Sequence, residues 1–326
     1  MDKYILCLSV FLFSVIFTVI IEAILIPLLA KKAKQPIYEG GPVWHLNKSG
    51  TPTMGGIAFV LSISLSTILV AFLLIANGNS RFGISILITA LFAIGNALVG
   101  LFDDMMKLYK KENAGLTPLQ KLGLQLILSI LFLMARARFS GDGSSVDFGL
   151  GKVDFGISYY PLAIVILLGI INCANLTDGI DGLASSVAGV IGLAFLLIGF
   201  ASSYDTPIIS SALAGGSCGF LFFNSHPAKI FMGDTGSLFL GAIAAGLAFS
   251  MNNPLLIIPI GIVYVIEGAS VILQVAVYKL TGKRLFKMAP LHHHLEKCGY
   301  GENSICIIAV ILTLILSAAT LLLMRN

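Results

Sequence analysis

Ten apolar runs follow one another along the chain, and each is close to the length that crosses a bilayer. A membrane-spanning helix needs about 20 mostly apolar residues, with a range of roughly 17–25. By that measure the pattern predicts spans near 4–30, 54–76, 83–102, 117–138, 159–175, 183–201, 207–223, 234–251, 255–280 and 304–324. The runs at 159–175 and 207–223 are the shortest, and short segments often border broken helices near a site.

The polar segments between these runs fall into two sets. With ten spans, both termini lie on one side of the membrane. Of the 20 Lys and Arg, 14 lie in the loops on the other side, at 31–53, 103–121, 176–182, 224–233 and 279–303. Lys and Arg concentrate in cytoplasmic loops, so these loops are predicted to be cytoplasmic and both termini extracytoplasmic. Residues 139–158 alternate like a small β-hairpin with Gly turns, which is predicted on the extracytoplasmic side.

Composition supports an all-α integral membrane protein. Hydrophobic residues make up 57% and charged residues 11%, against about 45–50% and 25% in soluble domains, so the apolar surplus must face lipid. No linker divides the chain, which predicts one transmembrane domain over 1–326. The first run is too long for a cleaved signal peptide. The net charge of +4 gives no reason to expect nucleic acid, and the five cysteines show no paired spacing.

The first candidate site is GLFDDMMK, at the predicted cytoplasmic end of the third span. Adjacent Asp103 and Asp104 repel each other unless a cation neutralises them, and Mg²⁺ prefers such oxygen ligands together with substrate phosphates. Lys107 lies one turn further on the same helical face. A solvated helix end with a local ion pair is the alternative interpretation.

The second candidate is INCANLTDGIDGLAS, where Asn172, Asn175, Asp178 and Asp181 recur every three residues. On a helix they would form a drifting polar stripe. Polar side chains at a membrane boundary are costly unless they are used, so they favour a functional site. The EF-hand pattern is absent.

Three further loops carry polar motifs on the same predicted side. In FNSHPAKIFMGDTGS, Asn224, His226 and Phe231 precede Asp234, which is either a helix N-cap or a metal ligand at a positive helix end. In the last loop, His292, His293 and His294 are followed by Glu296. Adjacent imidazoles rarely chelate one zinc ion, so donors to a pyrophosphate or sugar fit better.

The loop HLNKSGTPTMGG, with Lys48 and Thr53, is by itself a weak phosphate-loop signal and is not a Walker A motif.

Taken together, GLFDDMMK, NLTDGIDGL, FMGDTGS and MAPLHHHLEKCG resemble the polyprenyl-phosphate N-acetylhexosamine-1-phosphate transferase superfamily. The TPTMGG loop and the unbroken HHH-x-E run resemble its bacterial branch that handles phospho-N-acetylmuramoyl-pentapeptide. The resemblance implies transfer from UDP-N-acetylmuramoyl-pentapeptide to undecaprenyl phosphate, giving lipid I and UMP. It also implies Mg²⁺ and an active site on the cytoplasmic face of the bacterial plasma membrane.

The resemblance also implies residue roles. Asp103, Asp104 and Asp234 resemble the catalytic acids, with Asp234 the principal Mg²⁺ ligand and the other two further candidate ligands. Asn175, Asp178, Asp181 and Phe231 resemble the uridine pocket. Positions expected to contact the substrates are Lys48, Thr53, Lys107, Lys121, Asn172, Asn224, Gln274, His292, His293 and His294.

Several alternatives remain open on the sequence. A sister transferase would use UDP-N-acetylglucosamine, and an ion-coupled secondary transporter would place its acids at mid-membrane. Lys107 stands where a DDxxD prenyltransferase needs its third Asp. Abundant small residues on the spans are compatible with a homodimer. Direct attack by the lipid phosphate is favoured over a covalent phospho-enzyme. Glu22 and Glu267 are expected only to hydrogen-bond within the helix bundle.

Overall fold

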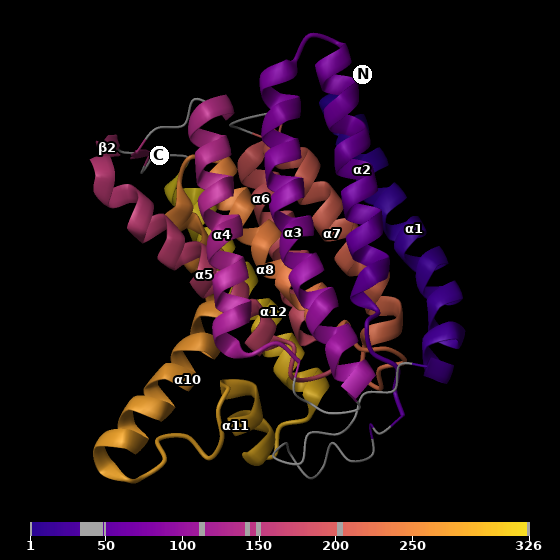
Figure 1. Cartoon of the computed structure of the whole chain (residues 1–326), viewed down its shortest axis with the longest axis vertical. Coiled ribbons are helices and arrows are strands. Elements are labelled where there is room, and N and C mark those ends of the chain that lie inside the picture. The colour runs from indigo at the N-terminus through magenta and orange to yellow at the C-terminus, as the bar shows by residue number, and fades with distance from the viewer. Residues whose placement is uncertain are drawn as a thin grey trace.

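The computed structural model describes residues 2–32, 48, 50–110, 115–140, 144–147, 151–200 and 205–324. Helices lie side by side along the long axis of the molecule (Figure 1). They are α1 (Lys3–Lys32), α2 (Gly56–Ala76), α3 (Ser80–Lys110), α4 (Pro118–Ala135), α5 (Tyr159–Thr177), α6 (Leu183–Gly199), α7 (Asp205–Asn224), α8 (Gly233–Ser250), α9 (Ile257–Ile260), α10 (Ile262–Thr281), α11 (Leu291–Lys297) and α12 (Glu302–Leu323). Short helical turns are η2 (Arg136–Ser140), η3 (Gly156–Ser158) and η4 (Pro254–Leu256).

The predicted all-α polytopic membrane fold is confirmed. Eight helices of the described chain are long and apolar enough to cross a bilayer, and α6 is a shorter apolar helix. The outer face of α1 exposes Leu8, Leu12, Ile16 and Ile20. Exposure of these apolar side chains would be costly in water and is expected where the helix faces lipid.

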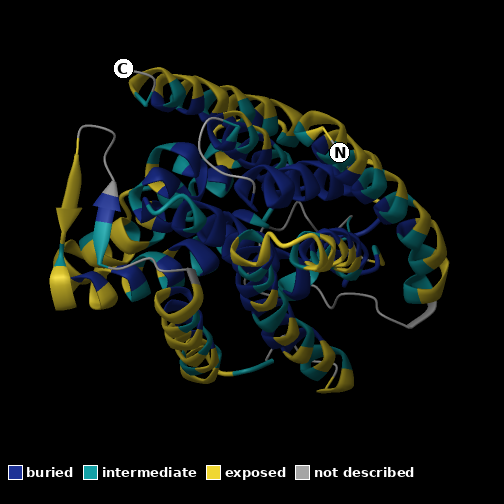
Figure 2. Cartoon of the chain, turned by 90° about the horizontal axis from the view of Figure 1, so that it is seen from above, coloured by how far each residue is buried: buried dark blue, intermediate teal, exposed yellow. Residues whose placement is uncertain are grey.

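The buried core runs through the middle of the bundle. Seen from above, buried residues occupy the centre and exposed residues the rim (Figure 2). In α8 every residue from Thr235 to Phe249 is buried, and α6 and α7 are largely buried beside it. The helix that carries Asp234 is therefore held on all sides, which fixes its first turn in space.

The predicted single span at 255–280 is wrong in detail, because the structure breaks it into η4, α9 and α10. Pro259 in α9 has no N–H to donate and its ring crowds the turn before it, at η4, and the chain leaves helical geometry at Gly261 before α10 begins. Beyond the break, α10 leans away from the bundle, and α11 lies between α10 and the bundle (Figure 1).

The predicted hairpin near 139–158 is confirmed. Strand β1 (Ser145–Asp147) pairs antiparallel with β2 (Lys152–Asp154), with Val146 opposite Val153; residues 141–143 and 148–150 lie outside the described chain. The hairpin and both chain ends lie towards one end of the bundle, and α11 lies at the other (Figure 1). The motif-bearing helix ends gather at the end that carries α11.

Candidate active site

Three carboxylates from two helices meet at this end of the bundle. Helix α3 continues to Lys110, beyond the span predicted at 83–102, and its last turns carry Asp103 and Asp104. Asp234 lies in the first turn of α8. Each of the three offers an oxygen, and these oxygens lie within 4.8 Å of one another. We call Asp103, Asp104 and Asp234 the carboxylate cluster.

Two lysines neutralise much of the charge in the carboxylate cluster. Lys107 Nζ lies 2.6 Å from Asp103 Oδ2 and 2.9 Å from Asp234 Oδ2, which confirms that Lys107 shares a helical face with Asp103. Lys121 Nζ, from α4, lies 2.7 Å from Asp234 Oδ2. The lysine side chains keep some exposure, at 31% and 17%, whereas Asp103 is buried, so the opening of the site is on the lysine side.

Asp104 anchors the start of α8. Its Oδ1 accepts the Asp234 N–H at 3.0 Å, and its Oδ2 accepts the Thr235 N–H at 2.9 Å and the Thr235 hydroxyl at 2.7 Å. A carboxylate suits the positive end of a helix, where backbone N–H groups have no partner within the helix. The N-cap alternative for Asp234 is not observed, because no side chain caps α8 from the N-cap position, Met232.

A glycine contact brings α3 and α8 close enough for these hydrogen bonds. A Cβ at Gly100, one turn before Asp104, would collide with the Asp234 carbonyl oxygen. On the other side of the same turn, a Cβ at Gly56 of α2 would collide with the backbone of Gly236. The first turn of α8 is thus packed between the backbones of two neighbouring helices.

Asn175 completes the ring of groups around Asp234. Its amide donates to Asp234 Oδ1 at 2.8 Å and to the hydroxyl of Ser237 at 2.7 Å. Helix α5 ends at Thr177, so only the first half of the predicted polar stripe is helical. Asn172 lies inside the bundle instead, where it donates to Gln125 Oε1 at 2.8 Å.

The donor set of the carboxylate cluster fits a hard divalent cation. All the candidate ligand atoms are carboxylate oxygens, which Mg²⁺ prefers. Both oxygens of Asp104 already accept hydrogen bonds from the start of α8, whereas Asp103 Oδ2 and Asp234 Oδ2 face the Lys107 ammonium. Asp103 and Asp234 are therefore the two acids of the cluster whose oxygens already face a cationic group.

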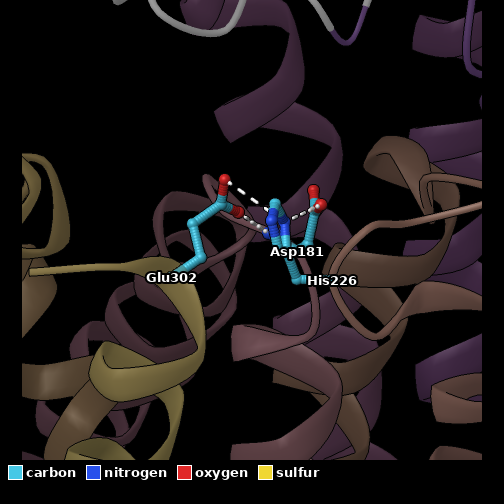
Figure 3. Close-up of side chains that lie close together, drawn as sticks. All are labelled: Asp181, His226 and Glu302. Carbon is cyan, nitrogen blue, oxygen red and sulfur yellow. Dashed lines mark hydrogen bonds and ion pairs between the residues drawn. The ribbon is translucent and has the colours of Figure 1, made fainter.

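A second polar cluster joins four segments that lie far apart in the sequence: Lys48, Asp181, His226 and Glu302, the four-segment cluster. Lys48 Nζ lies 2.7 Å from both Asp181 Oδ1 and Glu302 Oε2. His226 Nδ1 lies 2.8 Å from Asp181 Oδ2, and the three side chains other than Lys48 point towards one another (Figure 3). Although two carboxylates and an imidazole are also metal ligands, the Lys48 ammonium occupies the cationic position here.

Asp178 lies between the two clusters, and its carboxylate forms no hydrogen bond or ion pair with another described residue. Burial raises its pKa well above the usual range, and the negative charges of Asp234, Asp104 and Asp181 raise it further. In Asp181 burial also raises the pKa, but the hydrogen bond and charge of Lys48, with donors from Ala228 and His226, outweigh it and hold the pKa below its usual value.

Two residues that the sequence predicts as substrate contacts also link elements of the fold. Asn224 accepts from the Gly182 N–H at 3.1 Å and donates to the Ile230 carbonyl at 3.0 Å. Gln274 of α10 exchanges two hydrogen bonds with the backbone of Phe286. Both side chains shape loops at the site end.

Thr53 and Phe231 belong to two loops that pair through their backbones. The Phe231 N–H donates to the Pro52 carbonyl, and the Phe231 carbonyl accepts from the Gly55 N–H, both at 2.9 Å. Thr53 is buried beside Gly233, and the Phe231 ring keeps partial exposure. The ring is thus presented on a rigid loop next to the carboxylate cluster.

The three histidines do not share one environment. His292 is fully buried, its backbone N–H faces the Glu267 carboxylate, and its ring lies so close to Gly179 that a Cβ there would collide with it. His293 Nδ1 lies 2.6 Å from Glu296 Oε2, and His294 Nδ1 accepts from the Lys287 N–H at 3.1 Å.

Several site residues were missed by sequence reasoning. Thr235 and Ser237 stand in the same motif as Asp234, so their spacing on one helix was an available signal. Glu302 gave no such signal, because its partner Lys48 is 254 residues away. Glu267 accepts from His292, whereas the buried Glu22 carboxyl has no hydrogen bond among the described residues.

Comparison with known proteins identifies the family to which a chain with this site belongs. The profile for glycosyl transferase family 4 matches residues 84–252, and a phospho-N-acetylmuramoyl-pentapeptide-transferase signature matches 48–60. A phospho-N-acetylmuramoyl-pentapeptide-transferase of Clostridium botulinum (strain Eklund 17B / Type B) is 43% identical over 311 residues, covering 95% of this chain and 94% of the relative. That of Halalkalibacterium halodurans is 46% identical over 293 residues, covering 89% and 88%.

Proposed function

Because the chain belongs to glycosyl transferase family 4 and, within it, to the phospho-N-acetylmuramoyl-pentapeptide transferases, we infer that it makes lipid I. It transfers phospho-N-acetylmuramoyl-pentapeptide from the UDP donor to undecaprenyl phosphate and releases UMP. This is a membrane step of peptidoglycan synthesis. The structural observation that carries the assignment is the carboxylate cluster with Lys107 and Lys121, since two phosphate anions can react only where their charge is neutralised.

We propose that the transfer is a direct attack. An oxygen of the lipid phosphate forms a bond to the phosphorus attached to the sugar, the bond between that phosphorus and the oxygen bridging to UMP breaks, and UMP leaves with the electron pair. A phosphate monoester is largely ionised near neutral pH, so a strong base is not required. Asp103 orients the attacking phosphate through Lys107, and Lys107 and Lys121 attract the phosphates as point charges.

Mg²⁺ is the cofactor that this site would take, held by Asp234 and Asp103. When bound, it would neutralise and polarise the pyrophosphate. Asp104 has a positioning role in this proposal, because its oxygens hold the α8 turn that presents Asp234. Asn175 fixes the orientation of the Asp234 carboxylate.

Donor binding is assigned to the loops around Asp178. Phe231 would stack on the uracil ring, and Asp178 would accept hydrogen bonds from the nucleoside, since its carboxylate has no other described partner. Asp181 and Lys48 frame the same loop. His293 and His294 line the far side through α11, and the buried His292 positions that helix by packing on Gly179. Thr53, Asn224 and Gln274 act through the loops that they hold, and Asn172 through its link to Gln125.

The site is proposed to open on the cytoplasmic side. The loops that the sequence predicts on the cytoplasmic side carry 14 of the 20 Lys and Arg, and a soluble nucleotide donor is made in the cytoplasm. Undecaprenyl phosphate would reach the same end from the bilayer. Catalysis would therefore take place where the inner leaflet meets water.

The proposal is tested by mass spectrometry of the lipid product. Purified protein in detergent receives undecaprenyl phosphate and Mg²⁺ with either UDP-N-acetylmuramoyl-pentapeptide or UDP-N-acetylglucosamine. Product with the first donor alone supports the assignment. Product with the second donor alone would move the chain to the sister transferases.

A second assay separates direct attack from a covalent intermediate. Labelled UMP is incubated with donor and enzyme in the absence of lipid. Direct attack predicts no label in the donor. Exchange of label, or a substrate-derived adduct at Asp103, would contradict it.

A further inference from the structure

Glu302, the first residue of α12, reaches into the four-segment cluster beside His226 (Figure 3). We propose that Glu302 is a positioning residue that holds Asp181 and Lys48 in place for binding of the nucleotide donor. The proposal rests on the function proposed above. It extends the donor-binding part of the site to a helix that none of the motifs includes.

Glu302 holds its neighbours through two strong contacts. Its Oε2 accepts the backbone N–H of Asp181 at 2.8 Å and lies 2.7 Å from Lys48 Nζ. Its Oε1 lies 3.6 Å from His226 Nδ1. Among the described residues, Glu302 alone contacts both the backbone of Asp181 and the lysine that neutralises the Asp181 carboxylate. It therefore fixes both the position and the charge of that residue.

Helix stabilisation does not account for the direction of this side chain. An acid in the first turn of a helix is favourable wherever its carboxylate faces the helix N-terminus. The Glu302 carboxylate instead reaches across to the loop between α5 and α6, and its side chain is only 10% exposed. Burying a carboxylate is costly unless it is paired and hydrogen-bonded, so these partners determine its orientation.

The effect of Glu302 reaches the donor through a short loop. Asp178 and Asp181 are three residues apart, and Lys48 also acts electrostatically on Asp178. Without Glu302 the Asp181 N–H would lose its acceptor, and Lys48 would be paired with Asp181 alone. The Asp181 carboxylate would keep its contacts to His226 and Ala228, but the loop would lose the anchor of the Asp181 backbone, so Asp178 would be held less firmly. The carboxylate cluster keeps its own contacts to α3, α4 and α5, so the loss falls on donor binding more than on chemistry.

The experiment is steady-state kinetics on Glu302→Gln and Glu302→Ala, with UMP release as readout and donor and lipid varied separately. Glu302→Gln keeps an oxygen for the Asp181 N–H but loses the charge that attracts Lys48. We expect it to raise the donor KM about tenfold, the scale of one charge-assisted hydrogen bond, with kcat and lipid KM changed less than about threefold. Glu302→Ala should raise the donor KM further.

The matched control is Asp205→Asn. Asp205 is also a buried acid in the first turn of a helix, and it accepts from the Ser85 hydroxyl at 2.6 Å, but it lies at the opposite end of the bundle. It should lower the melting temperature and leave the donor KM unchanged.

Three outcomes of these kinetic measurements would overturn the proposal. If the Glu302 variants lose melting temperature and keep the wild-type donor KM, Glu302 only stabilises α12, and the transferase assignment stands. If kcat falls while donor KM is unchanged, its role is in the chemical step and not in donor binding. A wild-type protein that is folded but releases no UMP overturns this proposal together with the proposed function.

Discussion

Asp178 and Asp181 stand three residues apart in one loop, yet their surroundings move the two carboxyl pKa values in opposite directions. Asp181 faces Lys48 and keeps a low pKa, whereas Asp178 faces other carboxylates without a described partner and has a raised pKa. A carboxylate that has no partner and is surrounded by other acids marks a position where a bound ligand could supply the missing hydrogen-bond donors. The donor nucleoside is the ligand proposed here.

Asp178→Asn is expected to stabilise the protein without ligand or metal. The raised pKa means that the folded chain binds the Asp178 proton more tightly than the unfolded chain does. Ionisation of Asp178 therefore costs stability at any pH above its unfolded pKa of about 3.9, and most above its folded pKa. The variant should melt about 2 °C or more above wild type at pH 8, with a smaller difference at pH 5.

The same substitution should weaken donor binding, so activity and stability are expected to move in opposite directions. Thermal melting in detergent with a chelator, at both pH values, checks the first part. A variant that melts below wild type at pH 8 would contradict the unpartnered state of Asp178.

At the scale of elements, the catalytic geometry depends on how closely α3 approaches the first turn of α8. Gly100→Ala would place a methyl group against the Asp234 carbonyl oxygen and push the turn away from Asp104. We expect kcat to fall at least about tenfold, because small displacements at a reacting centre have large effects.

Gly169→Ala in α5 is the matched control for this substitution. A Cβ there meets nothing within 4 Å, and alanine favours a helix over glycine by about 1 kcal/mol. It should retain wild-type kcat and keep or raise the melting temperature. Equal activity in the two variants would show that the close approach is not needed.

The helices were largely predictable because apolar runs of bilayer length have few other structures open to them. The break at Gly261 was not predicted, although Pro259 was visible within the run. Asp103 and Asp104 of the carboxylate cluster, and Lys107 beside them, were predictable from their spacing on one helix. The partners of Asp181 were not, since Lys48, His226 and Glu302 come from three other segments whose packing no local pattern specifies.

For the whole molecule, the bundle predicts which end of each helix faces the cytoplasm. Cys298 is exposed at the site end, beside α11, and offers a native chemical probe of sidedness. A membrane-impermeant maleimide should label it in inside-out vesicles and not in intact cells. Asn77→Cys, in the exposed turn between α2 and α3, should label in intact cells when Cys298 is replaced by Ser. The reverse pattern would place the site outside. That the chain forms a homodimer remains a prediction, and a measurement of its mass in detergent would test it.

UMP release by the purified protein tests the central claim most directly. The reaction contains UDP-N-acetylmuramoyl-pentapeptide, undecaprenyl phosphate and Mg²⁺, and each is omitted in turn, with Asp234→Asn as the variant. Release that needs the lipid, stops with a chelator, and falls at least about a hundredfold in the variant is the result we predict. Release that continues without lipid or without Asp234, or no release from folded protein, would contradict transfer at the carboxylate cluster.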